Sequence, residues 1–187
     1  MQENCVILAG GKSSRMGQDK ALLPFENFPT LTHFQVNKFK SAFKNVLVSA
    51  KFDKFNGEFE LIKDIFEDFS PMNGLYSILS NFKNQNVFII PVDMPFVSFK
   101  TINLLYENLD DYEICVAKDR KNLHSLCGIY SSNLSFEALN LYKNGVNKIR
   151  NLFKKSKFKS VLFKNSEEFL NLNYFSEYEK LIKKGNL

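Results

Sequence analysis

Short apolar runs alternate with amphipathic segments along most of this chain, and this alternation constrains the fold more than any other feature. The runs are almost continuously apolar, as in strands that are buried on both faces. The predicted strands are residues 5–8, 46–49, 87–92, 114–117, 126–130 and 160–163. The predicted helices are residues 31–43, 75–82, 102–109, 134–142, 147–153 and 174–184. We therefore expect an α/β fold with a mostly parallel central sheet between helices, and ligands at the carboxyl ends of the strands.

Length and organisation favour one folding unit. The chain has 187 residues, which is enough to bury a substantial core, and it shows no internal repeat and no long linker. We predict a single domain over residues 1–187. The apolar runs are far shorter than a membrane span, and the N-terminus lacks the features of a signal peptide. We therefore expect a cytoplasmic protein.

The charge balance is mildly basic. Lys and Arg number 25 against 20 acidic residues, which gives a net charge of +5. The lysines are scattered and acidic residues lie between them, which is typical of a solvated surface rather than of a nucleic-acid footprint. Only Arg15, Arg120 and Arg150 are arginines, so each of them is a candidate for a specific role.

Cysteine usage indicates free thiols. Cys5, Cys115 and Cys127 are odd in number, far apart, and form no C-x-x-C pair. Neither a disulfide framework nor a zinc site is predicted. We expect three buried, unpaired cysteines.

A glycine-rich loop follows the first predicted strand. Gly10 and Gly11 come one residue after the strand, and Arg15, Gly17 and Lys20 follow. Glycines allow backbone N–H groups to approach a phosphate chain, while Arg and Lys neutralise its charge. The spacing matches neither G-x-x-x-x-G-K-[ST] nor G-x-G-x-x-G, so the loop predicts a phosphate site of a different kind.

The motif L-A-G-G-x-S-x-R-M-G-x-D-K, over residues 8–20, resembles the signature of the molybdenum cofactor guanylyltransferases. These belong to the wider nucleotidyltransferase group, with Rossmann-like, three-layer α/β folds. The resemblance continues along nearly the whole chain. It includes Asp64, the S-P-M-N-G loop at 70–74, P-V-D-M-P-F at 91–96, L-H-S at 123–125, residues 145–153 and F-L-N-L-N at 169–173.

The resemblance implies transfer of GMP from GTP to the phosphorylated molybdopterin form of molybdenum cofactor, with release of pyrophosphate. It assigns catalysis to Arg15, Lys20 and Asp93, and implies Mg²⁺ as the cofactor. The nucleotide-binding residues it implies are Leu8, Ala9, Gly10, Gly11, Lys20, Asp64, Gly74 and Asp93. It implies a monomer that binds GTP and molybdopterin, with transient contacts to molybdoenzymes or their chaperones.

Asp93 is the strongest candidate on its own chemistry. It follows the most apolar predicted strand, so its carboxylate is expected at the carboxyl edge of the sheet, where it would hold Mg²⁺. The alternative is that Asp93 caps the next helix. Asp64 is equally consistent with an ordinary loop residue.

The candidates for the second substrate are His124, Asn171 and Asn173. A lone histidine is also common as a structural residue, and the two asparagines would serve equally well as caps of the last predicted helix.

Two further enzyme functions and one function in binding remain open. The enzyme alternatives are cytidylyl transfer to molybdopterin and nucleotidyl transfer to a sugar phosphate. The other is a basic module that binds RNA or a molybdoenzyme without catalysis.

Overall fold

The computed structural model describes residues 1–11, 17–172 and Tyr178. Within these residues one sheet has seven strands in the order β3-β2-β1-β4-β6-β5-β7. The strands are β1 (Gln2–Leu8), β2 (Phe43–Ala50), β3 (Leu61–Lys63), β4 (Asn86–Pro91), β5 (Ile114–Lys118), β6 (Leu123–Ser131) and β7 (Phe158–Leu162). Strand β6 is antiparallel to its neighbours β4 and β5, and the other pairs are parallel. The predicted α/β class with a mostly parallel sheet is confirmed.

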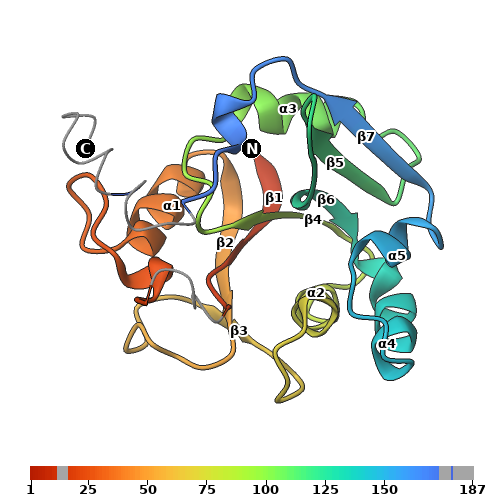
Figure 1. The fold of residues 1–187 in the computed structure, drawn as a ribbon, viewed down its shortest axis with the longest axis horizontal. Coiled ribbons are helices and arrows are strands. Elements are labelled where there is room, and N and C mark those ends of the chain that lie inside the picture. The colour runs from red at the N-terminus through yellow and green to blue at the C-terminus, as the bar shows by residue number, and fades with distance from the viewer. Residues whose placement is uncertain (12–16, 173–177, 179–187) are drawn as a thin grey trace.

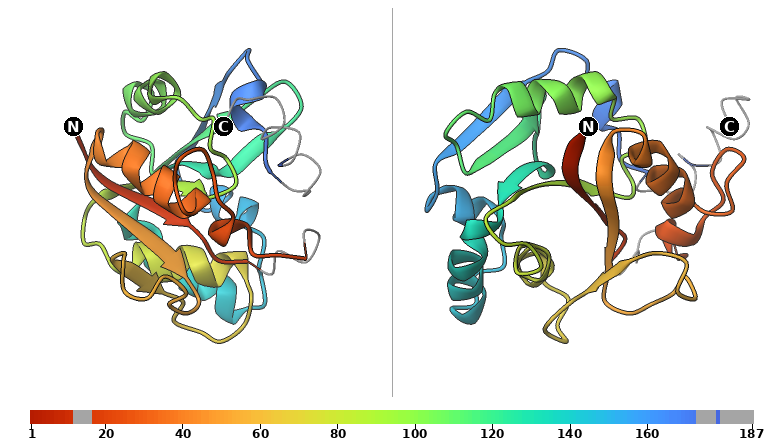
Figure 2. Two further views of the ribbon diagram at one scale, coloured as in Figure 1. Left: turned by 90° about the vertical axis from the view of Figure 1, so that its left-hand side faces the viewer. Right: turned by 180° about the vertical axis from the view of Figure 1, so that it is seen from behind.

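Helices cover both faces of the sheet, which gives three layers (Figures 1 and 2). The helices are α1 (Leu31–Lys40), α2 (Pro71–Leu79), α3 (Phe99–Glu107), α4 (Ser135–Lys143) and α5 (Arg150–Phe153). Helices α1 and α3 pack on one face, while α2, α4 and α5 pack on the other. The strands are buried from both sides, which explains their continuous apolar sequence.

Alternate residues of each central strand enter different cores. In β1, Cys5 and Ile7 face the α1 and α3 layer, whereas Val6 faces α2. In β4, Phe88 and Ile90 belong to the first core and Ile89 to the second. This period of two fixes the register of the strands, because a slip by one residue would exchange the two cores.

Helix-capping residues set several boundaries that the sequence patterns misplaced. Ser70 accepts a hydrogen bond from the Asn73 N–H, and Pro71 occupies the first turn, so residues 70–74 begin α2 instead of forming the predicted loop. The helix predicted for residues 31–43 ends at Lys40, because Phe43 already begins β2.

Other boundaries also differ from prediction. Strand β3 was not predicted, and β6 begins at Leu123, so His124 and Ser125 lie in a strand. Helix α5 covers only the end of the helix predicted for 147–153, and β7 begins two residues before the predicted strand 160–163. The helix predicted for 174–184 lies outside the described residues, apart from Tyr178.

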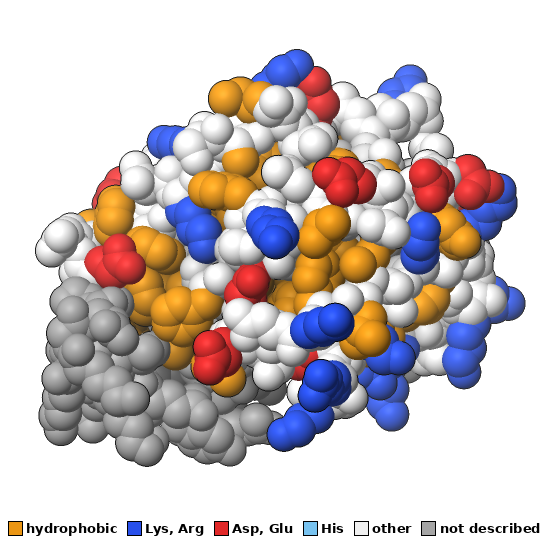
Figure 3. All heavy atoms as spheres, turned by 90° about the horizontal axis from the view of Figure 1, so that it is seen from above, with side chains coloured by type: hydrophobic (Ala, Val, Ile, Leu, Met, Phe, Trp, Pro, Cys, Tyr) orange, Lys and Arg blue, Asp and Glu red, His pale blue; other side chains and the backbone are white. Residues whose placement is uncertain are grey.

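Within the described residues, no helix is long and apolar enough to cross a membrane. Figure 3 shows one face of the molecule, on which acidic side chains lie beside basic ones in several places. The interspersed charges expected from the sequence are thus seen on that face.

Candidate functional site

The carboxyl ends of β1 and β4 lie side by side at the centre of the sheet. The two strands are parallel neighbours, with Leu8 opposite Pro91, and the Val92 N–H donates to the Leu8 carbonyl at 3.0 Å. The glycine loop leaves β1 at this edge. The segment that carries Asp93, residues 92–97, leaves β4 at the same edge and is called the Asp93 segment below. A sheet of this kind binds ligands at such an edge.

A pocket of about 520 Å³ opens there. It is lined by Leu8, Ala9, Gly10, Gly11, Asp19, Lys20, Ala21, Ser49, Asp64, Phe69, Ser70, Pro71, Gly74, Pro91, Val92, Asp93 and Leu126. Every described residue that the sequence assigned to nucleotide binding is among them. Arg15, by contrast, lies outside the described residues.

Lys20 and Asp93 meet in this pocket although they are 73 residues apart. The Lys20 Nζ lies 2.9 Å from Asp93 Oδ2, and both side chains are mostly buried. In such surroundings charges interact more strongly than in water. One cation and one carboxylate are therefore aligned at the junction of the two loops.

The glycine loop turns sharply where it leaves β1. Gly11 has φ of +128°, a backbone conformation that residues with a Cβ rarely adopt. This geometry explains why a glycine stands at position 11, and phosphate-binding loops use glycines in the same way.

Lys54 joins the two ends of the glycine loop. Its Nζ donates to the Ala9 carbonyl at 2.7 Å and also forms an ion pair with the Asp19 carboxylate. Asp19 in turn accepts from the Ala21 N–H and caps the short 3₁₀ helix Lys20–Leu22. Sequence reasoning missed Lys54, because one lysine in a lysine-rich chain carries no distinguishing pattern.

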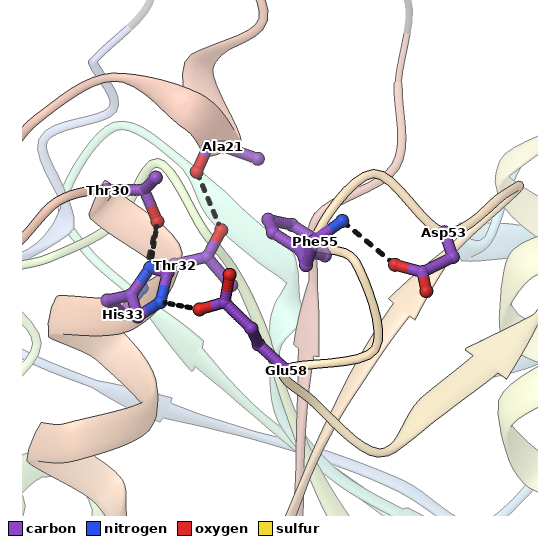
Figure 4. Close-up of polar contacts among 7 residues, drawn as sticks. All are labelled: Ala21, Thr30, Thr32, His33, Asp53, Phe55 and Glu58. Carbon is purple, nitrogen blue, oxygen red and sulfur yellow. Dashed lines mark hydrogen bonds and ion pairs between the residues drawn. The ribbon is translucent and has the colours of Figure 1, made fainter.

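The segment that carries Lys54 is itself tied to α1 (Figure 4). The Asp53 carboxylate accepts from the N–H groups of Phe55 and Gly57, which shapes the turn after Lys54. Farther along, Glu58 pairs with His33 of α1 at 2.7 Å. Lys54 is thus presented by a braced turn rather than by an extended loop.

Asp64 and Gly74 lie next to each other in the wall of the pocket. Asp64 follows β3 directly, and a Cβ at Gly74 would lie 3.9 Å from the Asp64 Oδ1. Burial raises the pKa of Asp64; Lys51 acts against this shift and Asp68 adds to it. The N-terminus of α2 also lines the pocket, and the N-terminus of a helix favours a negatively charged ligand.

His124 is engaged away from the pocket lining. Its Nε2 lies 3.1 Å from the Asp119 Oδ2, and its ring stacks on Phe169 with centroids 4.5 Å apart. Burial alone would raise the pKa of Asp119, but hydrogen bonds from Asn122, Lys121 and His124 lower it. Among the described residues that line the pocket, β6 contributes Leu126 and not His124.

The late asparagines are only partly described. Asn171 is half-buried and precedes Leu172, whose N–H donates to the Asp93 carbonyl at 2.9 Å. Asn171 is therefore next in sequence to a residue that is bonded to the Asp93 segment. It does not line the pocket itself. Asn173 lies outside the described residues.

The acidic residues of the pocket are candidate ligands for a metal ion. They are Asp19, Asp64 and Asp93. In the part of the chain that the structure describes, no group of three or more His, Cys, Asp or Glu side chains is placed to hold a metal. Mg²⁺ usually takes one or two carboxylates and completes its shell with waters and phosphate oxygens, so this donor set is suitable.

The cysteines lie in the strands, not in the pocket. Cys5, Cys115 and Cys127 are free and buried, as predicted. Burial raises the pKa of Cys115 to about 11 and that of Cys127 to about 12, and it also raises the pKa of Cys5. The thiols are therefore protonated near neutral pH and are poor nucleophiles.

Comparison with known proteins gives consistent matches along the chain. Residues 5–161 match the model of the MobA-like NTP transferase domain. The molybdenum cofactor guanylyltransferase of Campylobacter jejuni subsp. doylei is 52% identical, over 95% of this chain and 94% of the relative. The enzyme of the same name from Helicobacter pylori strain J99 is 32% identical, over 97% of this chain and 90% of its own.

Solved structures share the fold. The molybdopterin-guanine dinucleotide biosynthesis protein A of Archaeoglobus fulgidus superposes with a TM-score of 0.81, at 18% identity, over 97% of this chain and 99% of that protein. A protein from Aquifex aeolicus superposes with a TM-score of 0.69, at 28% identity, over 90% of this chain and 92% of its own.

Proposed function

Since this chain belongs to the MobA-like NTP transferases, and among them to the molybdenum cofactor guanylyltransferases, we propose that it transfers GMP from GTP to phosphorylated molybdopterin. The products are the guanine dinucleotide form of the cofactor and pyrophosphate. The observation that carries the proposal is the pocket in which the glycine loop, Lys20 and Asp93 meet.

The chemistry needs no covalent intermediate on the protein. An anionic oxygen of the pterin phosphate attacks the α-phosphorus of GTP, and the bond from that phosphorus to the bridging oxygen breaks. Pyrophosphate leaves with the bonding electron pair. The protein has to hold two polyanions in line and stabilise the negative charge that grows on the leaving group.

The glycine loop and Lys20 are suited to the triphosphate. Gly10, Gly11 and Lys20 all line the pocket, so the glycine N–H groups and the Lys20 ammonium would bind the phosphate oxygens. Arg15, assigned from the motif alone, adds a bidentate donor. Charge stabilisation by preorganised donors is the main contribution that such a site makes.

Asp93 would hold Mg²⁺, with Asp64 as a second carboxylate in the same pocket. When bound, the metal ion neutralises charge on the phosphate oxygens. Asp93 also keeps the Lys20 ammonium oriented, at 2.9 Å.

Guanine selection is assigned to backbone groups near Leu8 and to the first turn of α2, which line the same pocket. Leu126 and the neighbouring end of β6 would face the pterin. His124 would contribute to that side indirectly, through its contacts with Asp119 and Phe169. Asn171 would contribute as the residue before Leu172, whose N–H binds the Asp93 carbonyl.

We also propose that the protein is a cytoplasmic monomer that contacts molybdoenzymes or their chaperones transiently. The mixture of acidic and basic side chains in Figure 3 supports a soluble partner rather than a nucleic acid.

The test compares GTP, CTP and UTP with molybdopterin and with sugar phosphates as acceptors, with and without Mg²⁺, by pyrophosphate release. We expect turnover only with GTP, molybdopterin and Mg²⁺. A preference for CTP or for a sugar phosphate would replace the proposed substrate. Salt-sensitive RNA binding without pyrophosphate release would replace the enzyme by a binding module.

A further inference from the structure

The Asp93 segment, residues 92–97, joins β4 to α3 and has no regular secondary structure. Val92, Met94 and Val97 are nevertheless buried, so the polar backbone beside them is removed from water. Buried carbonyls without a hydrogen bond are costly, and a segment of this kind needs partners from elsewhere in the fold. Helix α1 supplies them.

Gln35 of α1 binds the carbonyls on either side of Asp93. It is fully buried, and its Nε2 donates to the Val92 carbonyl at 3.3 Å and to the Met94 carbonyl at 3.1 Å. Its Oε1 is buried and has no hydrogen-bond partner among the described residues. The amide therefore satisfies two carbonyls of the segment and leaves only its own oxygen unsatisfied.

Lys38 binds the next part of the segment. Its Nζ donates to the Pro95 carbonyl and to the Val97 carbonyl, both at 2.7 Å. Its cation also lies over the rings of Phe34 and Phe39. Burial lowers the pKa of Lys38 to about 8, although Glu168, Glu26 and Cys127 act to raise it. Burial therefore destabilises the charged form of the Lys38 side chain.

Gln35 and Lys38 are three residues apart, so they lie on the same face of α1. Together they bind four carbonyls of the Asp93 segment, and the Leu172 N–H binds the carbonyl of Asp93 itself. The backbone is thus fixed on both sides of Asp93, whose carboxylate meets Lys20. A helix that needed only to pack would bury apolar side chains here.

We propose that Gln35 and Lys38 are positioning residues, which fix the backbone of residues 92–97 so that the Asp93 carboxylate faces Lys20 and the bound nucleotide. The expected effect on turnover rests on the proposed function. The expected effect on the backbone of residues 92–97 does not. Neither residue lines the pocket, so neither is expected to contact the substrate.

Four variants test the proposal in the full-length protein. Gln35→Met and Lys38→Met keep much of the side-chain volume and remove the donors, and Lys38→Arg restores a charged donor. Lys40→Met is the matched control, because Lys40 is an exposed lysine on the same helix. We expect the two donor-deleting variants to lower kcat about 10- to 100-fold, as misplacement of a reacting group does, with little change in KM for GTP. Lys38→Arg should recover most of this loss, and Lys40→Met should resemble wild type.

Amide hydrogen exchange gives a readout that does not depend on turnover. In the wild type, the N–H groups of Val92 and Met94, which donate to the Leu8 and Pro91 carbonyls, should be protected from exchange. In both donor-deleting variants they should exchange faster, while β1 and α2 stay protected. If a variant fails to fold, the wild-type measurement and the other variant decide the question.

Wild-type kcat in a folded Gln35→Met or Lys38→Met variant would overturn the proposal. Rapid exchange of the Val92 and Met94 N–H groups in the wild type would do the same. If the wild type exchanges slowly there but transfers no GMP, the proposed function fails and the positioning of the segment stands.

Discussion

The two loops of the site are anchored in different ways. Lys54 holds the glycine loop through the Ala9 carbonyl and the Asp19 carboxylate, whereas α1 holds the Asp93 segment through four backbone carbonyls. An ammonium binds only acceptors, so Lys54 uses none of the N–H groups that a phosphate chain would need. In the Asp93 segment the functional group is the Asp93 carboxylate, so the backbone carbonyls are available to bind α1. In each loop the anchoring contacts thus avoid the groups that are proposed to bind the nucleotide or the metal ion.

The largest effect is expected from Asp93→Asn. The amide keeps the shape of the side chain but loses the charge that faces Lys20 and would hold Mg²⁺. Turnover should fall about 10³-fold or more, which is the upper range for a single preorganised group. Pyrophosphate release over a series of Mg²⁺ concentrations measures the loss, and a thermal melt controls for folding. Near-wild-type turnover at low Mg²⁺ would remove Asp93 from the site.

Lys20→Ala should have the next largest effect and tests the glycine-loop side. We expect kcat/KM to fall by an amount that corresponds to a loss of roughly 2–4 kcal/mol of transition-state stabilisation. We expect little change in the stability of the fold. Arg15→Ala should lose a similar amount, and Arg15→Lys should recover only part of it, because an ammonium cannot bind in a bidentate manner.

A double-mutant cycle of Lys20 and Arg15 on pyrophosphate release sharpens this assignment. Both groups are proposed to act on one phosphate chain, so the double variant should lose less than the sum of the single losses. Strict additivity would mean that they act on different groups. Full activity in Arg15→Ala would refute the assignment of the loop.

Breaking the anchor of the glycine loop should have a smaller effect. Asp19→Asn and Lys54→Met should each lower kcat/KM about 10- to 100-fold, through misplacement of Lys20. The double variant should lose no more than Lys54→Met alone, because that change already removes the Asp19 contact together with the bond to Ala9. Lys63→Met, at an exposed lysine of β3, is the control. Independent, additive losses would show that Lys54 does not act through Asp19.

The smallest expected effect is a pH dependence of the unfolding free energy, caused by Lys38, which anchors the Asp93 segment. Burial lowers the pKa of Lys38 from 10.5 to about 8. Between these values the unfolded chain binds more protons than the folded one, so the contribution of Lys38 to the free energy of unfolding rises with pH. Below pH 8 both states hold the proton, and the cost of burying the charge is present in full.

The difference in unfolding free energy between wild type and Lys38→Met should therefore move in favour of the wild type from pH 8 towards pH 10.5. Denaturant titrations at several pH values measure it, with Lys40→Met as the control. A difference that is constant, or that moves towards the variant, would contradict the buried ammonium at this position.

Local patterns predicted the parts of the site that depend on local chemistry. The glycine loop and Asp93 could be found because each directly follows a buried strand, and parallel strands bring their carboxyl ends together. The start of α2 could also have been recognised: Ser70 followed by Pro71 is typical of a helix N-terminus, but the resemblance to a family loop outweighed that signal.

The anchors could not be predicted in this way. Lys54 reaches Ala9 across 45 residues, and Lys38 reaches Pro95 across 57. Neither differs in its neighbouring sequence from the lysines that are solvated, and their partners are mostly backbone carbonyls, which every residue has. Strand β3 was missed because three residues are too short to show a period.

The hydrogen bond from Leu172 to Asp93 also bears on the order in which the molecule is assembled. It joins residues 79 positions apart, and β1, the first strand, must wait for β4 before both of its edges are paired. Contacts between distant parts of a chain close late in folding and slow it, because a long loop must be closed before they stabilise anything. The centre of the sheet can therefore form before the site is complete, because the Asp93 segment is fully held only when Leu172 has joined the fold.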